Sequence, residues 1–98
     1  MSEKLQIYVP RNGDWQNVRK EVARRLSERF GGATVDSARS GMWLNDNGDM
    51  VRDTVDVVYT YSDSIATETA EQIAEYVKNE LDEETVLYSI EEAKTGFV

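Results

Sequence analysis

The chain of 98 residues carries 19 acidic and 11 basic side chains, a net charge of −8, and neither cysteine nor histidine. These absences exclude disulfides, a thiolate nucleophile, a zinc–thiolate site and a histidine general base. The acidic balance also disfavours nucleic-acid binding, which needs lysine and arginine to neutralise phosphates.

The first predicted elements are a strand and a helix. Residues 4–10, KLQIYVP, alternate apolar and polar side chains, which is typical of a half-buried strand that ends at Pro10. RNGD then predicts a turn, with Asp14 as the helix N-cap. Apolar side chains recur at three- and four-residue steps and predict a helix from about 15 to 30; they are Trp15, Val18, Val22, Leu26 and Phe30.

The glycine-rich stretch that follows predicts two strands and their turns. Gly31 and Gly32 come directly after the helix, where a left-handed residue without a Cβ is favoured. A strand is expected from about 34 to 44, with a bulge or bend at Gly41. The sequence NDNG (45–48) is typical of a tight hairpin turn, and a return strand follows over 50–61.

A second helix is expected from about 65 to 82, followed by a strand over 85–90. Residues 94–98, KTGFV, are compatible with a short extra strand at the end. The order βαββαβ favours an α+β fold: a two-layer ferredoxin-like sandwich in which an antiparallel sheet carries both helices on one face. We expect residues 1–98 to form this single domain.

Four segments resemble a type of small uncharacterised ferredoxin-like domain found in bacteria, archaea and their viruses. They are FGGATV, SGMWLNDNGDMVRD, VVYTY and IAEYVKNELDEETVLYSI, and the likeness covers roughly residues 26–90. Their shared features are structural: the F-G-G-x-T element, a G-x-W strand, a glycine turn and a closing V-L strand. The resemblance implies the ferredoxin-like fold and no known activity.

Four side chains are candidates for an interface on the sheet face opposite the helices: Tyr8 and Trp43, with Val58 and Leu87 as further members. Because Gly41 interrupts the strand, the alternation does not decide on which face of the sheet Trp43 lies. A two-layer sandwich leaves that face uncovered, and aromatic and branched side chains there favour pairing with a second copy. The alternative is packing against the chain's own final segment or a bulged edge.

A second candidate surface is the acidic end of the second helix, formed by Glu80, Asp82, Glu83 and Glu84. Acids are unfavourable at the negative end of the helix dipole, so high salt or a basic partner would compensate them. The region 11–30 holds six basic side chains and 63–84 holds eight acidic ones. Salt bridges between the two helices are the simplest interpretation of this segregation.

Three other motifs do not match known phosphate, calcium or catalytic sites. GGAT lacks the lysine of a phosphate loop and follows a helix. Asp46, Asn47 and Asp49 lack the spacing of a calcium loop. Three strand carboxylates, those of Asp36, Asp53 and Asp56, could meet Arg39 or Arg52, although exposed strand charges are the usual arrangement. We therefore assign no catalytic residue, metal or cofactor.

Location and environment follow from composition. No apolar run approaches the roughly 18 residues of a membrane span, and the first residues lack signal-peptide features, so we expect a cytoplasmic protein. Seven arginines against four lysines, with the acidic excess, are typical of salt-tolerant proteins; an ordinary acidic protein is the alternative.

The sequence favours a small acidic, non-enzymatic interaction module that forms a homodimer or binds a basic protein surface. One alternative is a dimeric ferredoxin-like enzyme with a pocket between sheet and helices. Another is a viral or plasmid-borne inhibitor that imitates the charge of nucleic acid.

Overall fold

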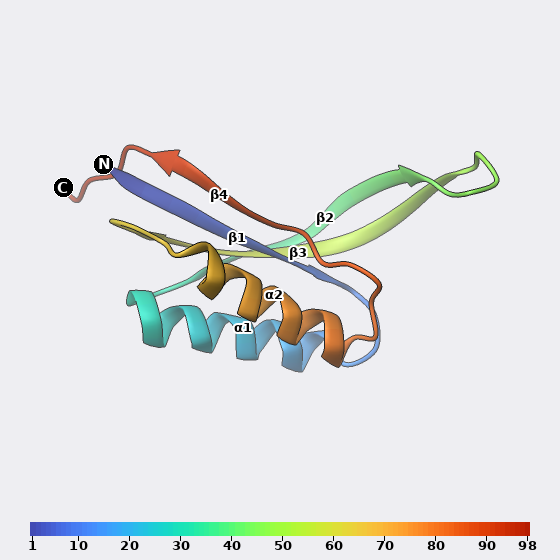
Figure 1. The fold of residues 1–98 in the computed structure, drawn as a ribbon, viewed down its shortest axis with the longest axis horizontal. Helices are drawn as coiled ribbons and strands as arrows, with labels where there is room; N and C mark the ends of the chain where they lie inside the picture. Colours follow the sequence, from blue (N-terminus) through green and yellow to red (C-terminus); the bar gives the residue numbers. More distant parts are fainter.

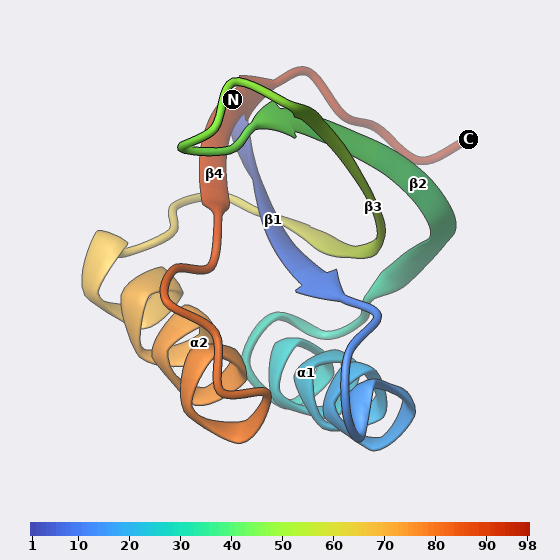
Figure 2. The same cartoon turned by 90° about the vertical axis from the view of Figure 1, so that its right-hand side faces the viewer.

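A computed structural model describes residues 1–98. Its six elements follow the predicted order and are β1 (Ser2–Pro10), α1 (Trp15–Phe30), β2 (Thr34–Leu44), β3 (Met50–Ser62), α2 (Thr67–Glu80) and β4 (Tyr88–Ala93). The four strands form one antiparallel sheet in the order β2-β3-β1-β4. Both helices lie side by side on one face of it (Figures 1 and 2). The predicted two-layer ferredoxin-like sandwich is confirmed.

The core lies between the sheet and the helices. Leu5, Ile7 and Val9 alternate along β1 and are completely buried, as the period of two requires of a strand with one covered face. Val22 and Leu26 of α1 are also completely buried. Their four-residue spacing gives the apolar stripe that α1 turns toward the sheet. Neither helix is long and apolar enough to cross a membrane.

The hairpin formed by β2 and β3 extends well beyond the two-layer body (Figure 1). Pro10, the last residue of β1, pairs with Val55, so the part of β3 before Val55 has only β2 beside it. The 16 residues of α1 span about 24 Å, whereas the 13 residues of β3 span about 44 Å. The length mismatch leaves residues 40–54, the projecting hairpin, without a covering helix.

The bulge in β2 is not at Gly41, where the sequence favoured it. Gly41 pairs regularly with Asp53, and the register shifts between Asp36 and Arg39. Ala38 takes a left-handed φ of 60° there, and its N–H donates to the carboxylate of Asp56 at 2.7 Å. A contact from β3 therefore stabilises the bulge at a residue other than glycine.

Two further boundaries differ from the prediction. Helix α2 begins at Thr67, because its N-cap residue Ala66 has an extended conformation with ψ of 131°; Ile65 lies before it, where its N–H donates to the Glu3 carboxylate at 2.7 Å. Strand β4 covers Tyr88–Ala93 in place of 85–90, because the preceding residues carry the chain from the end of α2 back to the sheet edge. Residues 94–98 form no extra strand.

The predicted glycine caps are confirmed. Gly31 has φ of 94° at the end of α1, and its N–H donates to the Ser27 carbonyl at 2.8 Å. Gly48 has φ of 81° in the hairpin turn. Asp14 occupies the N-cap position of α1 without a capping bond to the backbone, because its carboxylate accepts the Asn17 side-chain amide instead.

Candidate functional site

Three of the four predicted interface residues line one hollow on the open face of the sheet. Its volume is about 370 Å³, and Tyr8, Trp43 and Leu87 contribute to its wall. The Leu87 carbonyl accepts the N–H of Tyr8 at 3.1 Å, which fixes the start of β4 beside β1. Regular pairing after the bulge, Arg39 with Val55 and Trp43 with Val51, brings Trp43 to the same face. We call this hollow the open-face pocket.

The open-face pocket combines apolar and acidic walls. Its remaining lining residues are Pro10, Asp53, Val55, Glu83, Thr85 and Val86. Trp43 is 48% exposed and Leu87 61% exposed, so a large part of this apolar surface contacts water. Clusters of exposed apolar side chains with a polar rim are typical of interaction sites.

Val58, the fourth predicted interface residue, lies on the opposite face. It is completely buried in the core between sheet and helices, and it pairs with Ile7 and Val35. The period-two alternation of β3 puts Val57 and Tyr59, not Val58, on the open face. The prediction for Val58 is therefore wrong by one residue of strand phase.

The projecting hairpin exposes apolar side chains on both of its faces. Met42, Leu44 and Met50 are 60–65% exposed on one face, and Trp43 lies on the other. A two-stranded hairpin is marginally stable in water when no other layer covers it. This exposed surface was not predicted from the sequence. The two predicted strands are longer than the helices that could cover them, and this difference in length indicates it.

A buried carboxylate ties the base of this hairpin to the helix layer. Asp56 is completely buried and faces the helices. Its Oδ1 accepts Arg11 Nη2 at 3.1 Å and the Ala38 N–H at 2.7 Å, and its Oδ2 accepts Arg19 Nη1 at 3.2 Å. Both guanidinium groups also lie against the ring of Trp15, at 4.3 Å and 5.2 Å. We call these contacts the Asp56 hub.

The electrostatics of the Asp56 hub indicate a structural role. Burial favours the neutral acid, but the Ala38 N–H and the Arg11 guanidinium outweigh burial and hold the pKa of Asp56 below its usual range. A general acid needs the opposite shift. Asp36 forms an exposed ion pair with Arg39, and Asp53 lines the open-face pocket, so the three strand carboxylates do not gather at one catalytic centre.

The acidic end of α2 forms a Schellman-type helix end. The N–H of Glu83 donates to the Lys78 carbonyl at 3.0 Å, and Asp82 has a left-handed φ of 52°. Asn12 crosses from the loop after β1, and its amide donates to the Leu81 carbonyl and to the Glu83 carboxylate. No ion pair neutralises Glu80, Asp82, Glu83 or Glu84.

The expected salt bridges between the two helices are absent. The ion pairs of α1 are internal: Glu21 binds Arg24 and Arg25, and Arg24 also binds Glu28. The hydrogen bonds from Arg24 and Arg25 lower the pKa of Glu21 to about 2. The basic and acidic segments therefore do not neutralise each other through direct contacts.

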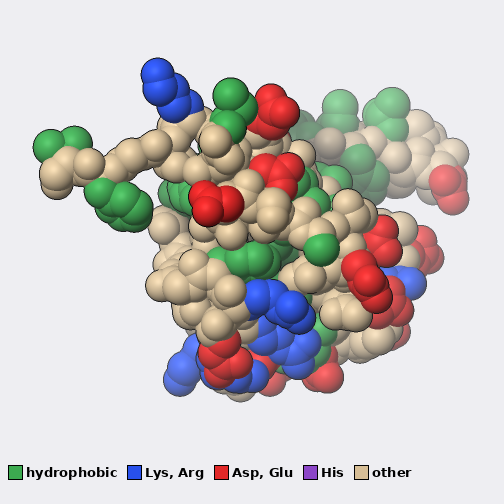
Figure 3. Space-filling view, turned by 60° about the vertical axis from the view of Figure 1, so that its left-hand side comes forward, with side chains coloured by type: hydrophobic (Ala, Val, Ile, Leu, Met, Phe, Trp, Pro, Cys, Tyr) green, Lys and Arg blue, Asp and Glu red, His purple; other side chains and the backbone are tan.

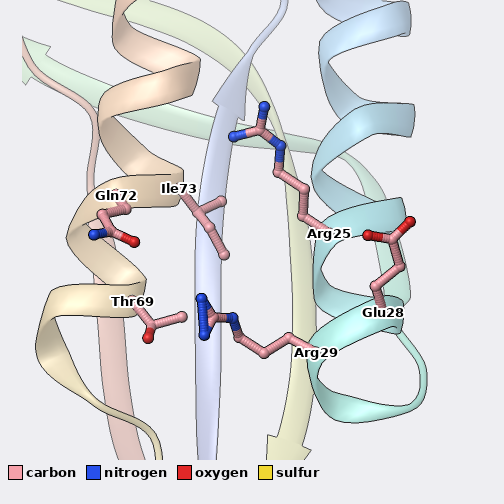
Figure 4. A pocket seen from close by; sticks show the side chains of 6 residues that line it. All are labelled: Arg25, Glu28, Arg29, Thr69, Gln72 and Ile73. Carbon is pink, nitrogen blue, oxygen red and sulfur yellow. The ribbon is translucent and has the colours of Figure 1, made fainter.

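The antiparallel packing of the helices explains this absence. Arg25 and Arg29 extend from α1 toward the first turns of α2, where they face Thr69, Gln72 and Ile73 across a notch of about 360 Å³ (Figure 4). The acidic end of α2 lies at the other end of the helix pair (Figure 1). The Arg25 guanidinium instead stacks 3.9 Å from the ring of Tyr76.

The polar motif of the hairpin turn forms turn structure. In the hairpin turn the Asn45 side chain accepts the N–H groups of Asn47 and Asp49, which explains the clustered polar residues as turn structure. No three acidic side chains gather in a geometry that could hold a metal ion. A hollow of about 270 Å³ lies between α2 and β4, where Tyr88 donates to Glu71; this contact, after burial, raises the pKa of Tyr88.

No family model matches the chain, and no curated protein matches its sequence. Solved structures of similar fold include the divalent cation tolerance protein CutA1 from Thermus thermophilus, with 17% identity, a TM-score of 0.68, and coverage of 99% of this chain and 88% of that chain. The periplasmic divalent cation tolerance protein CutA from Archaeoglobus fulgidus gives 14% identity, a TM-score of 0.67 and coverage of 99% and 88%.

A phage SAM lyase in complex with S-methyl-5'-thioadenosine is also similar, with 15% identity, a TM-score of 0.66 and coverage of 93% of this chain and 81% of that chain. At these identities the likeness shows the ferredoxin-like fold alone.

Proposed function

We propose that this chain is a small, non-enzymatic interaction module of the cytoplasm that associates with copies of itself through the projecting hairpin and the open-face pocket. The main observation behind this proposal is the accessible surface area of the chain. The chain exposes 6609 Å², whereas a compact monomer of 11.2 kDa exposes about 5,700 Å². The excess of about 900 Å² is close to the roughly 800 Å² that each partner buries in a standard interface.

The shape of the molecule supports the same proposal. Its radius of gyration is 14.0 Å, against about 12.6 Å for a compact chain of this length, and its longest dimension is 47 Å. The projecting hairpin and the C-terminal residues, at opposite ends of the molecule, both contribute to the elongation (Figure 1). The exposed apolar side chains of the hairpin gain a covering layer when a second copy packs against them. The homodimer expected from the sequence and a larger closed ring both satisfy this requirement.

The test is the mass in solution. Light scattering at micromolar concentration should give twice 11.2 kDa or a higher whole multiple. Replacing Met42 and Leu44 by serine should shift the mass toward 11.2 kDa, while the matched change of Glu68 and Glu75 to serine on the exposed face of α2 should leave it unchanged. A wild-type chain that stays monomeric across concentration and salt would refute self-association.

The acidic end of α2 is the proposed docking surface for a basic protein. Its four carboxylates have no cationic partner within the chain, so a basic surface would gain their attraction without displacing an existing ion pair. Binding of a lysine-rich test protein should weaken steeply with salt and should fail when Asp82 and Glu83 become Asn and Gln. Binding that survives these two changes would assign the contact to another surface.

A second candidate is an enzyme whose ligand occupies the open-face pocket. The pocket volume lies at the lower end of the range for small-molecule sites, and Tyr8 and Trp43 offer aromatic surface beside the Asp53 and Glu83 carboxylates. The fold similarity to a phage lyase that binds a thionucleoside favours a nucleoside as ligand. Calorimetric titration with S-methyl-5'-thioadenosine tests this candidate. Loss of binding in Trp43→Leu would support the pocket, and no heat at millimolar nucleoside would rule it out.

A further inference from the structure

The last residues of the chain form a second unpartnered apolar surface at the opposite end of the molecule. We call residues 94–98 the tail. Its position is fixed by the side-chain hydrogen bond between Thr95 and Ser2, at 2.7 Å. Beyond Thr95 the tail leaves the body with its apolar side chains standing free, and Phe97 and Val98 are fully exposed (Figure 3).

The tail and the open-face pocket are complementary in chemistry. The tail contributes the cation of Lys94 and the aromatic ring of Phe97. The pocket contributes two acidic side chains, Asp53 and Glu83, and the exposed indole of Trp43. Charge complementarity and a free aromatic side chain facing an aromatic-lined hollow are the features of a buried anchor in an interface.

The tail is too short to enter the pocket of its own chain. Thr95 is held at Ser2, and Phe97 lies two residues farther, so it reaches at most about 7 Å along the backbone. Tyr8, at the pocket, lies six residues along β1 from Ser2, a distance of about 20 Å. Only a tail from another molecule can bring Phe97 to Trp43.

We infer that the tail of one copy docks into the open-face pocket of another copy, with Phe97 against Trp43 and Lys94 near Asp53. This inference rests on the proposed self-association and names its contact. Because tail and pocket lie at opposite ends of the molecule, each copy donates one tail and accepts one. Such a contact forms a reciprocal pair or a ring where the rotation between copies closes, and an open filament where it does not.

Cysteine cross-linking tests the contact, because the chain has no cysteine of its own. Copies carrying Gly96→Cys are mixed with copies carrying Thr85→Cys, a residue of the pocket wall, and oxidised. A disulfide-linked product of two chains is expected. Copies carrying Glu75→Cys, on the exposed face of α2, are the matched control and should give none with Gly96→Cys.

Affinity provides the second measurement. Phe97→Ala should weaken association by about 10- to 100-fold in sedimentation experiments, the equivalent of losing one buried aromatic side chain. Lys94→Glu should also weaken it, and Asp53→Lys in the same chain should restore part of the loss. These changes leave the core intact, so circular dichroism should remain that of the wild type.

The outcomes separate the two proposals. If the wild type assembles but the Gly96–Thr85 disulfide fails to form and Phe97→Ala has no effect, tail docking is wrong and self-association stands. If the wild type is a monomer at every concentration, self-association fails and takes the docking contact with it. A disulfide together with weakened association of Phe97→Ala supports both.

Discussion

Replacing Asp56 by asparagine should destabilise the chain far more than any other single carboxylate change on the sheet. The substitution keeps the shape of the side chain and removes its charge. Two arginines, Arg11 and Arg19, then lose the anion that they share, and the Ala38 N–H keeps only a neutral acceptor. The perturbation is confined to the Asp56 hub.

The magnitude follows from burial. Hydrogen bonds to a charged group contribute about 1.5–3 kcal/mol each, and removing one partner of a buried ion pair costs about 3–5 kcal/mol. The Arg11 and Arg19 side chains are each 30% exposed, so water can solvate their guanidinium groups when the carboxylate is gone. This solvation offsets part of the lost stabilisation. We expect Asp56→Asn to lower the free energy of unfolding by about 2–3 kcal/mol, a large share of the roughly 5–15 kcal/mol of a typical domain.

Urea unfolding of the wild type, Asp56→Asn and a matched control measures the effect. The control is Asp36→Asn, because the Asp36–Arg39 pair is exposed on the neighbouring strand and should contribute under about 1 kcal/mol. Hydrogen exchange at Ala38 should also accelerate in Asp56→Asn, since the bulge loses its strongest acceptor. Equal losses in the two variants, or a loss below about 1 kcal/mol in Asp56→Asn, would refute this account of the hub.

The same variant changes the response to acid. Because the folded-state pKa of Asp56 lies below its unfolded value of about 3.9, its stabilisation is fully present above that pH and is lost as the pH falls through the folded-state pKa. The wild type should therefore lose stability more steeply than Asp56→Asn on acidification below about pH 4. Parallel curves of stability against pH for the two chains would contradict the assigned direction.

Four other changes test the caps and the acidic helix end. Gly31→Val should cost about 1–2 kcal/mol in urea unfolding because φ is 94° there, and Gly32→Val, where φ is not left-handed, should cost less. Asp82→Gly should add about 0.5–1 kcal/mol, because it relieves a left-handed φ and removes an acid from a helix C-terminus; a loss would contradict the Schellman assignment. Raising salt from about 0.01 M to about 1 M shortens the Debye length from about 30 Å to about 3 Å and should raise the melting temperature. Combining Asp82→Asn with Glu83→Gln should reproduce part of that gain at low salt, and a fall in melting temperature would show net attraction instead.

The sequence was sufficient for the fold wherever local pattern and tertiary packing agree. The alternation of Leu5, Ile7 and Val9 and the four-residue spacing of Val22 and Leu26 each specify one buried face, and the structure buries both. Glycine at the end of α1 has a local cause, so its left-handed φ was predictable as well.

Long-range contacts explain the errors. Ile65, which the sequence places in the helix, lies before its start, where its N–H donates to Glu3, a residue 62 positions earlier in the chain. The bulge lies at Ala38 because the carboxylate of Asp56 reaches its N–H, and no local pattern marks Ala38 as left-handed. The burial of Asp56 was missed for the same reason as that of Val58: the two residues share one strand phase, and that phase was predicted to lie on the open face.

The sequence identifies some residues of the candidate site and not its extent. Tyr8, Trp43 and Leu87 line one pocket, but the face of Trp43 depends on the bulge at Ala38, which the sequence did not predict. Their role in an interface stays a prediction. The exposed surface of Met42, Leu44 and Met50 was not foreseen, because it depends on how far the helices extend beneath the hairpin. Comparing the predicted element lengths supplies that information.

The Asp56 hub lies at the point where the projecting hairpin leaves the body. Pro10, the last residue of β1, pairs with Val55, the neighbour of Asp56 in β3, and the bulge at Ala38 lies directly opposite in β2. Bulges increase local twist and bend the strand that carries them, so the hub sets the direction in which the hairpin projects. The contacts that stabilise the monomer and the surface proposed for assembly are therefore mechanically connected. A hairpin held by a buried, doubly paired carboxylate keeps its exposed apolar faces in one orientation, which lowers the entropy lost when a second copy covers them.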